Sequence, residues 1–416
     1  MRKKIVAIIF GTAIVASMSV GCGKEASAPA STSETAVSSV EASNESQEAS
    51  SAEEVGEEVD ADQAAADEVA ALIDAIYVQT RTDETDAQCK AAKEAWDKLT
   101  EEQKLLVEGE DADYDYFGRD TGDASLDDTL NQDGIGENEI LVVSFGTSFN
   151  ESRAKDISGI EKAIAAAYPE WSVRRAFTAQ IIINHVQARE DMAIDNVDQA
   201  IERAIANGVK NLVVQPTHLM HGAEYDEMVE CISAYADKFE SITYSEPLLG
   251  PVAASKNDIN SDKETVAKAV VAATLKDAGF NSVEEANNAG VAFVYMGHGT
   301  SHNAKISDSQ MQVQMAELGY ENCFIGTVEG EPEETACENV IEAIKAAGFK
   351  KVILRPLMVV AGDHANNDMA GEDEDSWKSL FEASGAFESI DTQIAGLGRI
   401  EDVQKLYIAH LAEVIK

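Results

Sequence analysis

The sequence has few cysteines and few basic residues, and each shortage excludes a class of protein. Its 416 residues include five cysteines, and no two have the Cys-x-x-Cys spacing of a zinc or thiol-redox site. Lys and Arg total 32 against 76 Asp and Glu, which gives a net charge of −44. Such a chain repels the phosphate backbone, so we expect no nucleic acid as a partner. The hydroxyl-rich segment 144–148 lacks the Gly-Lys-Ser/Thr ending of a phosphate loop, so we expect no nucleotide cofactor.

The N-terminus has the pattern of a bacterial export signal. A basic head, Arg2-Lys3-Lys4, precedes an apolar stretch, Ile5–Val20, and Gly21-Cys22 follows at once. This pattern predicts a lipoprotein signal peptide over 1–22, lipidation of Cys22 and a place on the extracytoplasmic face of the cell membrane. The stretch is too short for a comfortable membrane span, which takes about 20 residues. Ser19 stands where lipoproteins usually have Leu, so an ordinary secreted protein and an uncleaved anchor remain open.

Three segments separate this signal from the main part of the chain. Residues 23–60 are Ser, Ala and Glu with no apolar pattern, which predicts a disordered tether. Residues 61–108 have apolar residues at helical spacing, and Thr100-Glu-Glu-Gln103 has the pattern of a capping box. We therefore expect a small all-α module there. The acidic stretch 109–137, with Gly and Asp, is typical of a second linker.

From Asn138 the chain alternates between strands and helices. This alternation predicts an α/β fold of two lobes, 138–285 and 286–416, each a parallel sheet flanked by helices. The expected strands are 139–144, 172–177, 211–216, 241–245, 291–296, 324–328, 351–356 and 390–394. The expected helices include 152–167, 195–207, 223–238, 261–278, 335–347 and 400–415.

The two lobes resemble each other in sequence. Ser144-Phe-Gly-Thr-Ser148 matches Gly297-His-Gly-Thr-Ser301, and Leu212-Val-Val-Gln-Pro216 matches Val352-Ile-Leu-Arg-Pro356. Within these matches Phe145 corresponds to His298, and eight residues after each proline Glu224 corresponds to His364. The repeat therefore keeps the backbone pattern and changes the side chains at the ends of strands.

Polar side chains at these strand ends are the candidate site. Ligands bind beyond the carboxyl ends of parallel strands, and two imidazoles delivered there can bind a metal ion or move protons. His298 and His364 are the two histidines, and Glu329, at another strand end, completes a three-ligand set for a divalent metal. His302 either faces the same site or caps the next helix. A lone strand-end histidine is more often a structural residue than a ligand, and we expect this of His221, which flanks the first-lobe strand end together with His218.

These segments resemble the anaerobic-type cobalt chelatases, which insert Co²⁺ into sirohydrochlorin for cobalamin synthesis. The resemblance covers 138–416 and rests on these matches: Leu141-Val-Val-Ser-Phe-Gly-Thr-Ser148, Arg175-Ala-Phe-Thr-Ala179, Gly222-Ala-Glu-Tyr225, Met296-Gly-His-Gly299, Gly326-Thr-Val-Glu329, Pro356-Leu-Met-Val-Val-Ala-Gly-Asp-His-Ala-Asn-Asn-Asp-Met369 and Asp375-Ser-Trp-Lys378. It implies two similar lobes, as in class II chelatases related to ferrochelatases, around a tetrapyrrole site.

The resemblance also implies roles for particular residues. His298, His364 and Glu224 are expected to be catalytic, and His298, Glu329 and His364 to bind the metal. Residues expected to contact the substrate are Ser144, Gly146, Thr147, Ser148, His218 and Gly299. Arg153, Arg174, Arg175 and Arg355 are candidates for pairing with the substrate's carboxylates.

Two functions remain open from the sequence. The first is a chelatase acting on Co²⁺, or on Fe²⁺ or Ni²⁺, as its substrate metal. The second is a surface lipoprotein that binds metal or tetrapyrrole for uptake without turnover. The export signal favours the second function and the His/His/Glu set favours the first. The sequence does not indicate an oligomeric state.

Overall fold

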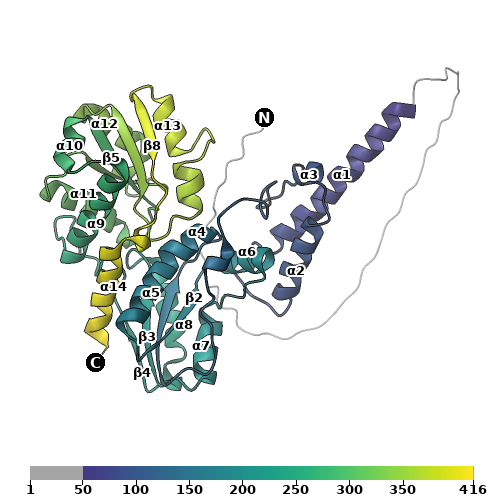
Figure 1. Cartoon of the computed structure of the whole chain (residues 1–416), viewed down its shortest axis with the longest axis horizontal. Helices are drawn as coiled ribbons and strands as arrows, with labels where there is room; N and C mark the ends of the chain where they lie inside the picture. Colours follow the sequence, from purple (N-terminus) through teal and green to yellow (C-terminus); the bar gives the residue numbers. More distant parts are fainter. Residues whose placement is uncertain (1–49, 416) are drawn as a thin grey trace, which may run out of the picture. The chain divides into compact units, whose positions relative to one another are not determined.

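The computed structural model describes the backbone of residues 50–415 and the side chains of residues 61–415 (Figure 1). The predicted signal peptide, Cys22 and most of the predicted tether lie outside the described residues. The first helix begins at Ser50 and so includes the end of that tether. No described helix has both the length and the apolar character needed to cross a bilayer.

Within residues 50–415, eight strands form two four-stranded parallel sheets, as the sequence predicted. The first sheet has the order β2-β1-β3-β4 and the second β6-β5-β7-β8, so the two share one topology. The strands are β1 (Asn138–Ser144), β2 (Ser172–Phe177), β3 (Asn211–Pro216), β4 (Ser241–Tyr244), β5 (Val291–Gly297), β6 (Cys323–Thr327), β7 (Lys351–Pro356) and β8 (Ser389–Thr392). Each lies within two residues of its predicted range.

Helices connect the strands and cover both faces of each sheet. The helices of the two lobes are α4 (Asn150–Ser152), α5 (Ser158–Ala167), α6 (Gln180–Glu190), α7 (Val197–Ala206), α8 (Ala223–Ser233), α9 (Ser261–Ala278), α10 (Val283–Asn288), α11 (Ile306–Glu317), α12 (Cys337–Ala347), α13 (Trp377–Ala383) and α14 (Glu401–Val414). Before β1 lie α1 (Ser50–Asp74), α2 (Thr85–Trp96) and α3 (Glu101–Lys104). Two π-helical turns, η2 (Arg153–Ile157) and η6 (Ala365–Met369), lie beside the strand ends.

Alternate side chains of β1 enter two different hydrophobic clusters. Leu141 and Val143 pack with the apolar faces of α7 and α8. Ile140 and Val142 belong to a larger cluster that also contains Phe293 of the second sheet. Because successive side chains of a strand point to opposite faces, one face of each sheet contributes to this shared core. The lobes are therefore joined by buried apolar packing.

Two helices cross between the lobes, so the predicted division after residue 285 does not follow the packing. Helix α9 precedes the division, yet its Thr274 accepts a 3.1 Å hydrogen bond from the buried Tyr295 of the second sheet. Helix α14 ends the chain, yet its Tyr407 donates a 3.0 Å hydrogen bond to the carbonyl of Thr217 beside the first sheet. Sequence order assigns each helix to the wrong side because an amphipathic pattern does not identify the sheet that it covers.

The helical segment before the lobes packs against the first of them. Its core contains Trp96 and Phe117, whose rings lie 5.7 Å apart at 85°. Helix α2 packs along α6, and Asn184 of α6 donates a 2.8 Å hydrogen bond to the carbonyl of Ile76. The capping box predicted at Thr100 is present. The stretch predicted as an acidic linker contributes Phe117 to this core, so its apolar residues are partly buried.

Candidate active site

The same backbone hydrogen bonds close the strand ends in both lobes. The N–H of Glu329 donates to the carbonyl of His298 at 2.9 Å, and the N–H of Ala179 donates to the carbonyl of Phe145 at 3.2 Å. Ala179 is therefore the first-lobe counterpart of Glu329, a correspondence that the sequence matches did not include. All three predicted metal ligands thus stand where the first lobe has a different residue.

The two predicted histidines are in contact. The rings of His298 and His364 lie 4.6 Å apart between centroids, at an interplanar angle of 78°. Nδ1 of His298 lies 2.7 Å from the carbonyl oxygen of Gly299, and Nδ1 of His364 lies 2.6 Å from Oδ2 of Asp368. Since both of these oxygens accept, each Nδ1 carries the proton and each Nε2 keeps its lone pair. Two neighbouring rings thus have a basic nitrogen left to bind a metal or accept a proton.

The surroundings shift the pKa values of the two rings in opposite directions. Burial lowers the pKa of His298, and the neighbouring His364 adds to that decrease. Burial also lowers the pKa of His364, but the hydrogen bond and charge of Asp368 outweigh burial and raise it. At neutral pH His298 is therefore the more readily unprotonated ring, and His364 is the ring better able to hold a proton.

Glu329 lies near the pair at the end of β6. Its charge acts on both imidazoles, and its side chain is exposed. Gly299 has a φ of +87°, and a Cβ there would lie 3.0 Å from the Cβ of Glu329, so only glycine permits this approach. Among residues 61–415 no three His, Cys, Asp or Glu side chains are arranged to hold a metal ion.

Glu224 reaches the site from the first lobe. It lies in the first turn of α8, and its charge interacts with His364. Although the side chain reaches solvent, burial among surrounding protein atoms and the carboxylate of Glu227 raise the pKa of Glu224. Two residues further on, Asp226 Oδ2 lies 3.6 Å from Nε2 of His302, which also caps the next helical turn. The first turn of α8 thus faces the second-lobe histidines.

The predicted substrate segment 144–148 is packed tightly into the protein. Oγ of Ser144 lies 2.6 Å from Oγ1 of Thr217, so this hydroxyl has an internal partner. Gly146 has a φ of +103°, and a Cβ there would lie 2.5 Å from the ring of Phe177. Thr147 approaches the second lobe, since a Cβ on Gly362 would lie 3.0 Å from its Oγ1. The segment therefore lies against the loop that carries His364. Its most accessible side chain is the apolar Phe145, which is 41% exposed, and its most accessible polar side chain is that of Ser148.

His218 has a different setting from the histidine pair. Its ring is 9% exposed at the end of β3, and among the described residues neither of its nitrogens has a hydrogen-bond partner. Burial lowers the pKa of His218 to about 4, so the ring is neutral at physiological pH. No described contact joins it to His298 or His364.

The four arginines proposed to pair with substrate carboxylates have internal partners instead. Each is at most 1% exposed, which excludes them from a surface that meets substrate. Each pairs with an acid of the protein, as Arg175 does with the buried Glu161 at 2.6 Å. The four are Arg153, Arg174, Arg175 and Arg355. Sequence inspection does not separate such buried arginines from surface ones, because both occur beside strand ends.

Asp368 is the site residue that the sequence analysis did not assign. It lies four residues after His364, a spacing that places both side chains on one face of a helical turn. That spacing was visible in the sequence, but the turn itself was not predicted. Carboxylates that hold the far nitrogen of a histidine are a common feature of metal sites, because they orient the ring.

Comparison with known proteins places most of the chain in one group. A model of the family described as Cobalt chelatase (CbiK) matches residues 138–416. A sirohydrochlorin cobaltochelatase of Salmonella typhimurium is 32% identical over 276 residues, which cover 66% of this chain and 96% of that protein. A second, from Nitratidesulfovibrio vulgaris, is 29% identical over 278 residues, covering 66% and 90%. Among solved structures, SirB from Bacillus subtilis with Fe³⁺ is 15% identical, with a TM-score of 0.44 and coverage of 67% and 95%.

Proposed function

Because this chain belongs to the cobalt chelatase family, we propose that it is a sirohydrochlorin cobaltochelatase. It would insert Co²⁺ into a sirohydrochlorin-type tetrapyrrole, a step of anaerobic cobalamin synthesis. The names of its two relatives support the substrate. The observation that carries the proposal is the contact between His298 and His364. Each ring has its Nδ1 hydrogen-bonded, and among the described residues neither Nε2 has a hydrogen-bond partner.

The reaction exchanges two protons for one metal ion. Co²⁺ enters the macrocycle, two pyrrole N–H bonds break, and two protons leave for groups of the protein and then for water. His298, His364 and Glu329 would bind Co²⁺ and replace part of its water shell. The two Nε2 atoms would accept the pyrrole protons as the metal moves from imidazole to macrocycle.

The opposite pKa shifts suit two different roles. His298, whose pKa is lowered, is the better candidate to bind the metal at neutral pH because its Nε2 is unprotonated. His364, whose pKa is raised by Asp368, holds a transferred proton more readily. Glu224, whose pKa is also raised and whose charge interacts with His364, would take part in the release of that proton.

The substrate-contacting part of the proposal rests on the two glycine-rich loops. Gly146 and Gly299 both have positive φ, so both loops come close to their neighbours without a side chain in the way. Ser148, at the more open end of the first loop, is the residue of 144–148 best able to meet a substrate carboxylate. His218 would contribute only after a rearrangement that exposes its ring.

One assay tests the proposal. Protein lacking residues 1–22 is mixed under anaerobic conditions with sirohydrochlorin and Co²⁺, and the absorbance change of metal insertion is followed. We expect a rate above the uncatalysed background that falls in His298→Ala and His364→Ala. A rate equal to background would contradict the enzyme, and a rate unaffected by both substitutions would contradict the site. Parallel assays with Fe²⁺ and Ni²⁺ identify the preferred metal.

A second candidate function follows from the export signal. Sirohydrochlorin is made in the cytoplasm, whereas residues 1–22 predict an exported lipoprotein anchored through Cys22. A surface protein that binds metal or tetrapyrrole for uptake would use the same site without turnover. Tight binding of Co²⁺ or sirohydrochlorin without insertion would favour this carrier. Cys22→Ser should release the protein from the membrane fraction, and retention there would contradict lipidation.

A further inference from the structure

The segment Asp113–Leu130, which we call the strap, lies before the region that matches the family and yet bonds to both lobes. One of its acids is buried in the first lobe, and its one arginine, Arg119, reaches the loop that carries His364. A dispensable linker would make neither contact. The strap therefore requires an explanation that the family match does not supply.

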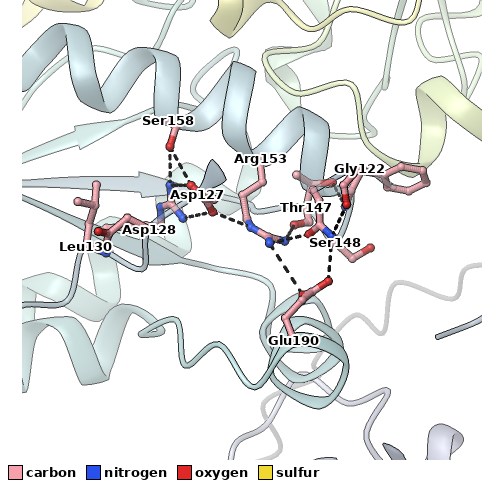
Figure 2. A network of polar contacts seen from close by, with 12 residues as sticks. Gly122, Asp127, Asp128, Leu130, Thr147, Ser148, Arg153, Ser158 and Glu190 are labelled. Carbon is pink, nitrogen blue, oxygen red and sulfur yellow. Dashed lines mark hydrogen bonds and ion pairs between the residues drawn. The ribbon is translucent and has the colours of Figure 1, made fainter. Parts of the chain in front are cut away.

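Asp127 is the strap's contact with the first lobe (Figure 2). Its carboxylate is fully buried and bonds to the guanidinium groups of Arg153 at 2.7 Å and Arg175 at 2.8 Å. Ser158 donates a further 2.8 Å hydrogen bond. These partners hold the pKa of Asp127 well below its usual range, with burial opposing them. The strap thus supplies a buried negative charge to two buried arginines of the first lobe, in addition to the charges of Glu161 and Glu190.

Arg153 carries this contact to the predicted substrate segment. Figure 2 shows Arg153 between Asp127 on one side and Glu190 and Thr147 on the other. Its Nη1 donates to the carbonyl of Thr147 at 3.3 Å. Thr147 in turn approaches Gly362, two residues before His364. A charge in the strap therefore helps to fix the loop of 144–148.

Arg119 is the strap's contact with the second lobe. Two of its nitrogens bond to Asp115 at 3.0 Å, which fixes the direction of the guanidinium. Nη1 then donates to Oδ1 of Asn367 at 3.2 Å. Asn367 lies in the π-helical turn η6 and donates to Asp363 at 2.7 Å. Arg119 thus contacts the turn η6, which begins directly after His364 and contains Asp368.

The backbone of the strap is fixed between these two points. The N–H of Glu151 donates to the carbonyl of Thr121 at 2.7 Å, and that of Arg175 donates to the carbonyl of Leu130 at 3.1 Å. Gly122 has a φ of +103°, and a Cβ there would lie 3.0 Å from the backbone nitrogen of Glu151. The strap therefore follows the surface of the first lobe closely.

We infer that the strap is a positioning element of the active site, in which Arg119 acts on His364 through Asn367. It holds the loop of 144–148 and the turn of 364–368 at a fixed separation, and so presets the place of the metal-binding imidazole. The inference rests on the proposed function for its chemistry. It adds a residue from outside the matched region to the groups that determine metal affinity.

A double-mutant cycle in the full chain without residues 1–22 tests this inference. The affinity for Co²⁺ is measured by calorimetry in wild type, Arg119→Ala, Asn367→Ala and the double variant. We expect each single substitution to weaken binding roughly 3- to 10-fold, as contacting side chains with a shared task do. The double variant should bind Co²⁺ with about the same affinity as the single variant that binds Co²⁺ more weakly. Independent, additive losses, or no loss in Arg119→Ala, would overturn the inference.

Arg203→Ala is the matched control. Arg203 is 31% exposed against 32% for Arg119, and it also bonds to two acids, Asp195 and Asp133. We expect this variant to bind Co²⁺ as wild type does, and an equal loss would show that Arg119 acts only through general stability.

Amide hydrogen exchange of residues 361–369 gives a readout that needs neither metal nor turnover. It should accelerate in Arg119→Ala and remain unchanged in Arg203→Ala. If wild type inserts no cobalt, the proposed function fails while this comparison still decides the role of the strap. Unchanged exchange in Arg119→Ala would overturn that role even in an active enzyme.

Discussion

The two lobes share a backbone and differ in the side chains that it presents. Their sheets have the same strand order, and Val143 pairs with Pro216 as Met296 pairs with Pro356. At the equivalent strand ends the first lobe has Phe145, Ala179 and Glu224, and the second has His298, Glu329 and His364. The fold therefore tolerates either set, because backbone hydrogen bonds and buried apolar residues hold the strand ends in place.

The difference suggests how a duplicated scaffold acquires a site on one side. A strand end needs its backbone partners, and these do not depend on the side chain that projects beyond them. In the second lobe Glu329 is exposed and the two histidines are partly buried, so all three side chains extend beyond the packed core. Each prediction below changes one feature that distinguishes the lobes.

The largest effect on activity should come from replacing His298 with phenylalanine, the residue at the corresponding position of the first lobe. We expect His298→Phe to reduce cobalt insertion about 100- to 10,000-fold, because the substitution removes a group that binds metal and accepts protons. Anaerobic rates with sirohydrochlorin measure the effect, and thermal unfolding shows whether the fold is kept. His221→Phe is the control, since His221 bonds to Glu246 at 2.6 Å away from the pair. Equal losses in the two variants would contradict the assignment.

The next effect concerns the buried charges of the first lobe. Asp127→Asn should lower the free energy of unfolding by about 3–5 kcal/mol at pH 7, because Arg153 and Arg175 lose a buried counter-charge. The pKa of Asp127 is depressed in the folded state, so its contribution is present above about pH 4 and is lost as the pH falls further. Urea unfolding at pH 7 and pH 3 measures both.

The neighbouring acid is the control for this substitution. Asp128 is exposed and accepts one local hydrogen bond from the N–H of Leu130 at 2.8 Å. Asp128→Asn should change the unfolding free energy by less than about 1 kcal/mol at pH 7. If both substitutions destabilise the chain equally, Asp127 is no more than another surface acid.

A smaller effect should follow from changing the carboxylate that orients His364. Asp368→Asn should weaken Co²⁺ binding about 10- to 100-fold at pH 8, as the loss of such partners does in other metal sites. Asp368 raises the pKa of His364, so its loss lowers that pKa. Because Co²⁺ binds the neutral ring, the acid limb of the binding profile should move to lower pH. Calorimetry from pH 5 to pH 8 measures both effects, with Glu374→Gln at an exposed loop position as control.

The smallest effect concerns a buried acid of the second lobe whose influence on stability depends on pH in the opposite sense to that of Asp127. Asp308 in α11 is fully buried, and among the described residues neither of its oxygens has a hydrogen-bond partner. Burial raises the pKa of Asp308 to about 7. The folded state therefore binds a proton that the unfolded state has lost above about pH 4, and stability falls as the pH rises toward 7. In Asp308→Asn the free energy of unfolding should therefore decrease between pH 5 and pH 7 by roughly 1–2 kcal/mol less than in wild type.

Unfolding at the two pH values measures the slope, and Asp391→Asn on the exposed side of β8 is the control. An unchanged slope in Asp308→Asn would show that Asp308 ionises freely in the folded protein. The two buried acids would then behave alike despite their different surroundings.

The sequence itself determined the secondary structure and the repeat. Apolar runs bounded by glycine and polar residues define strands locally, so all eight were predicted within two residues and are confirmed. The corresponding motifs at residues 144–148 and 297–301 are local as well, which is why the duplication was visible. The same locality made His298 and His364 candidates, because a strand end is recognisable without its neighbours.

The tertiary structure alone decided which distant groups meet. In the folded protein the ring centroids of His298 and His364 lie 4.6 Å apart, and Asp368 is hydrogen-bonded to His364. The four arginines that the sequence analysis considered as partners of substrate carboxylates are buried. Helix α9 packs on the second sheet and α14 contacts the first, opposite to their order in the sequence. The segment predicted as a linker contacts both lobes through Asp127 and Arg119. A sequence pattern reports whether a residue prefers burial. It does not report which partner, tens or hundreds of residues away, meets its charge, because that depends on how whole elements pack.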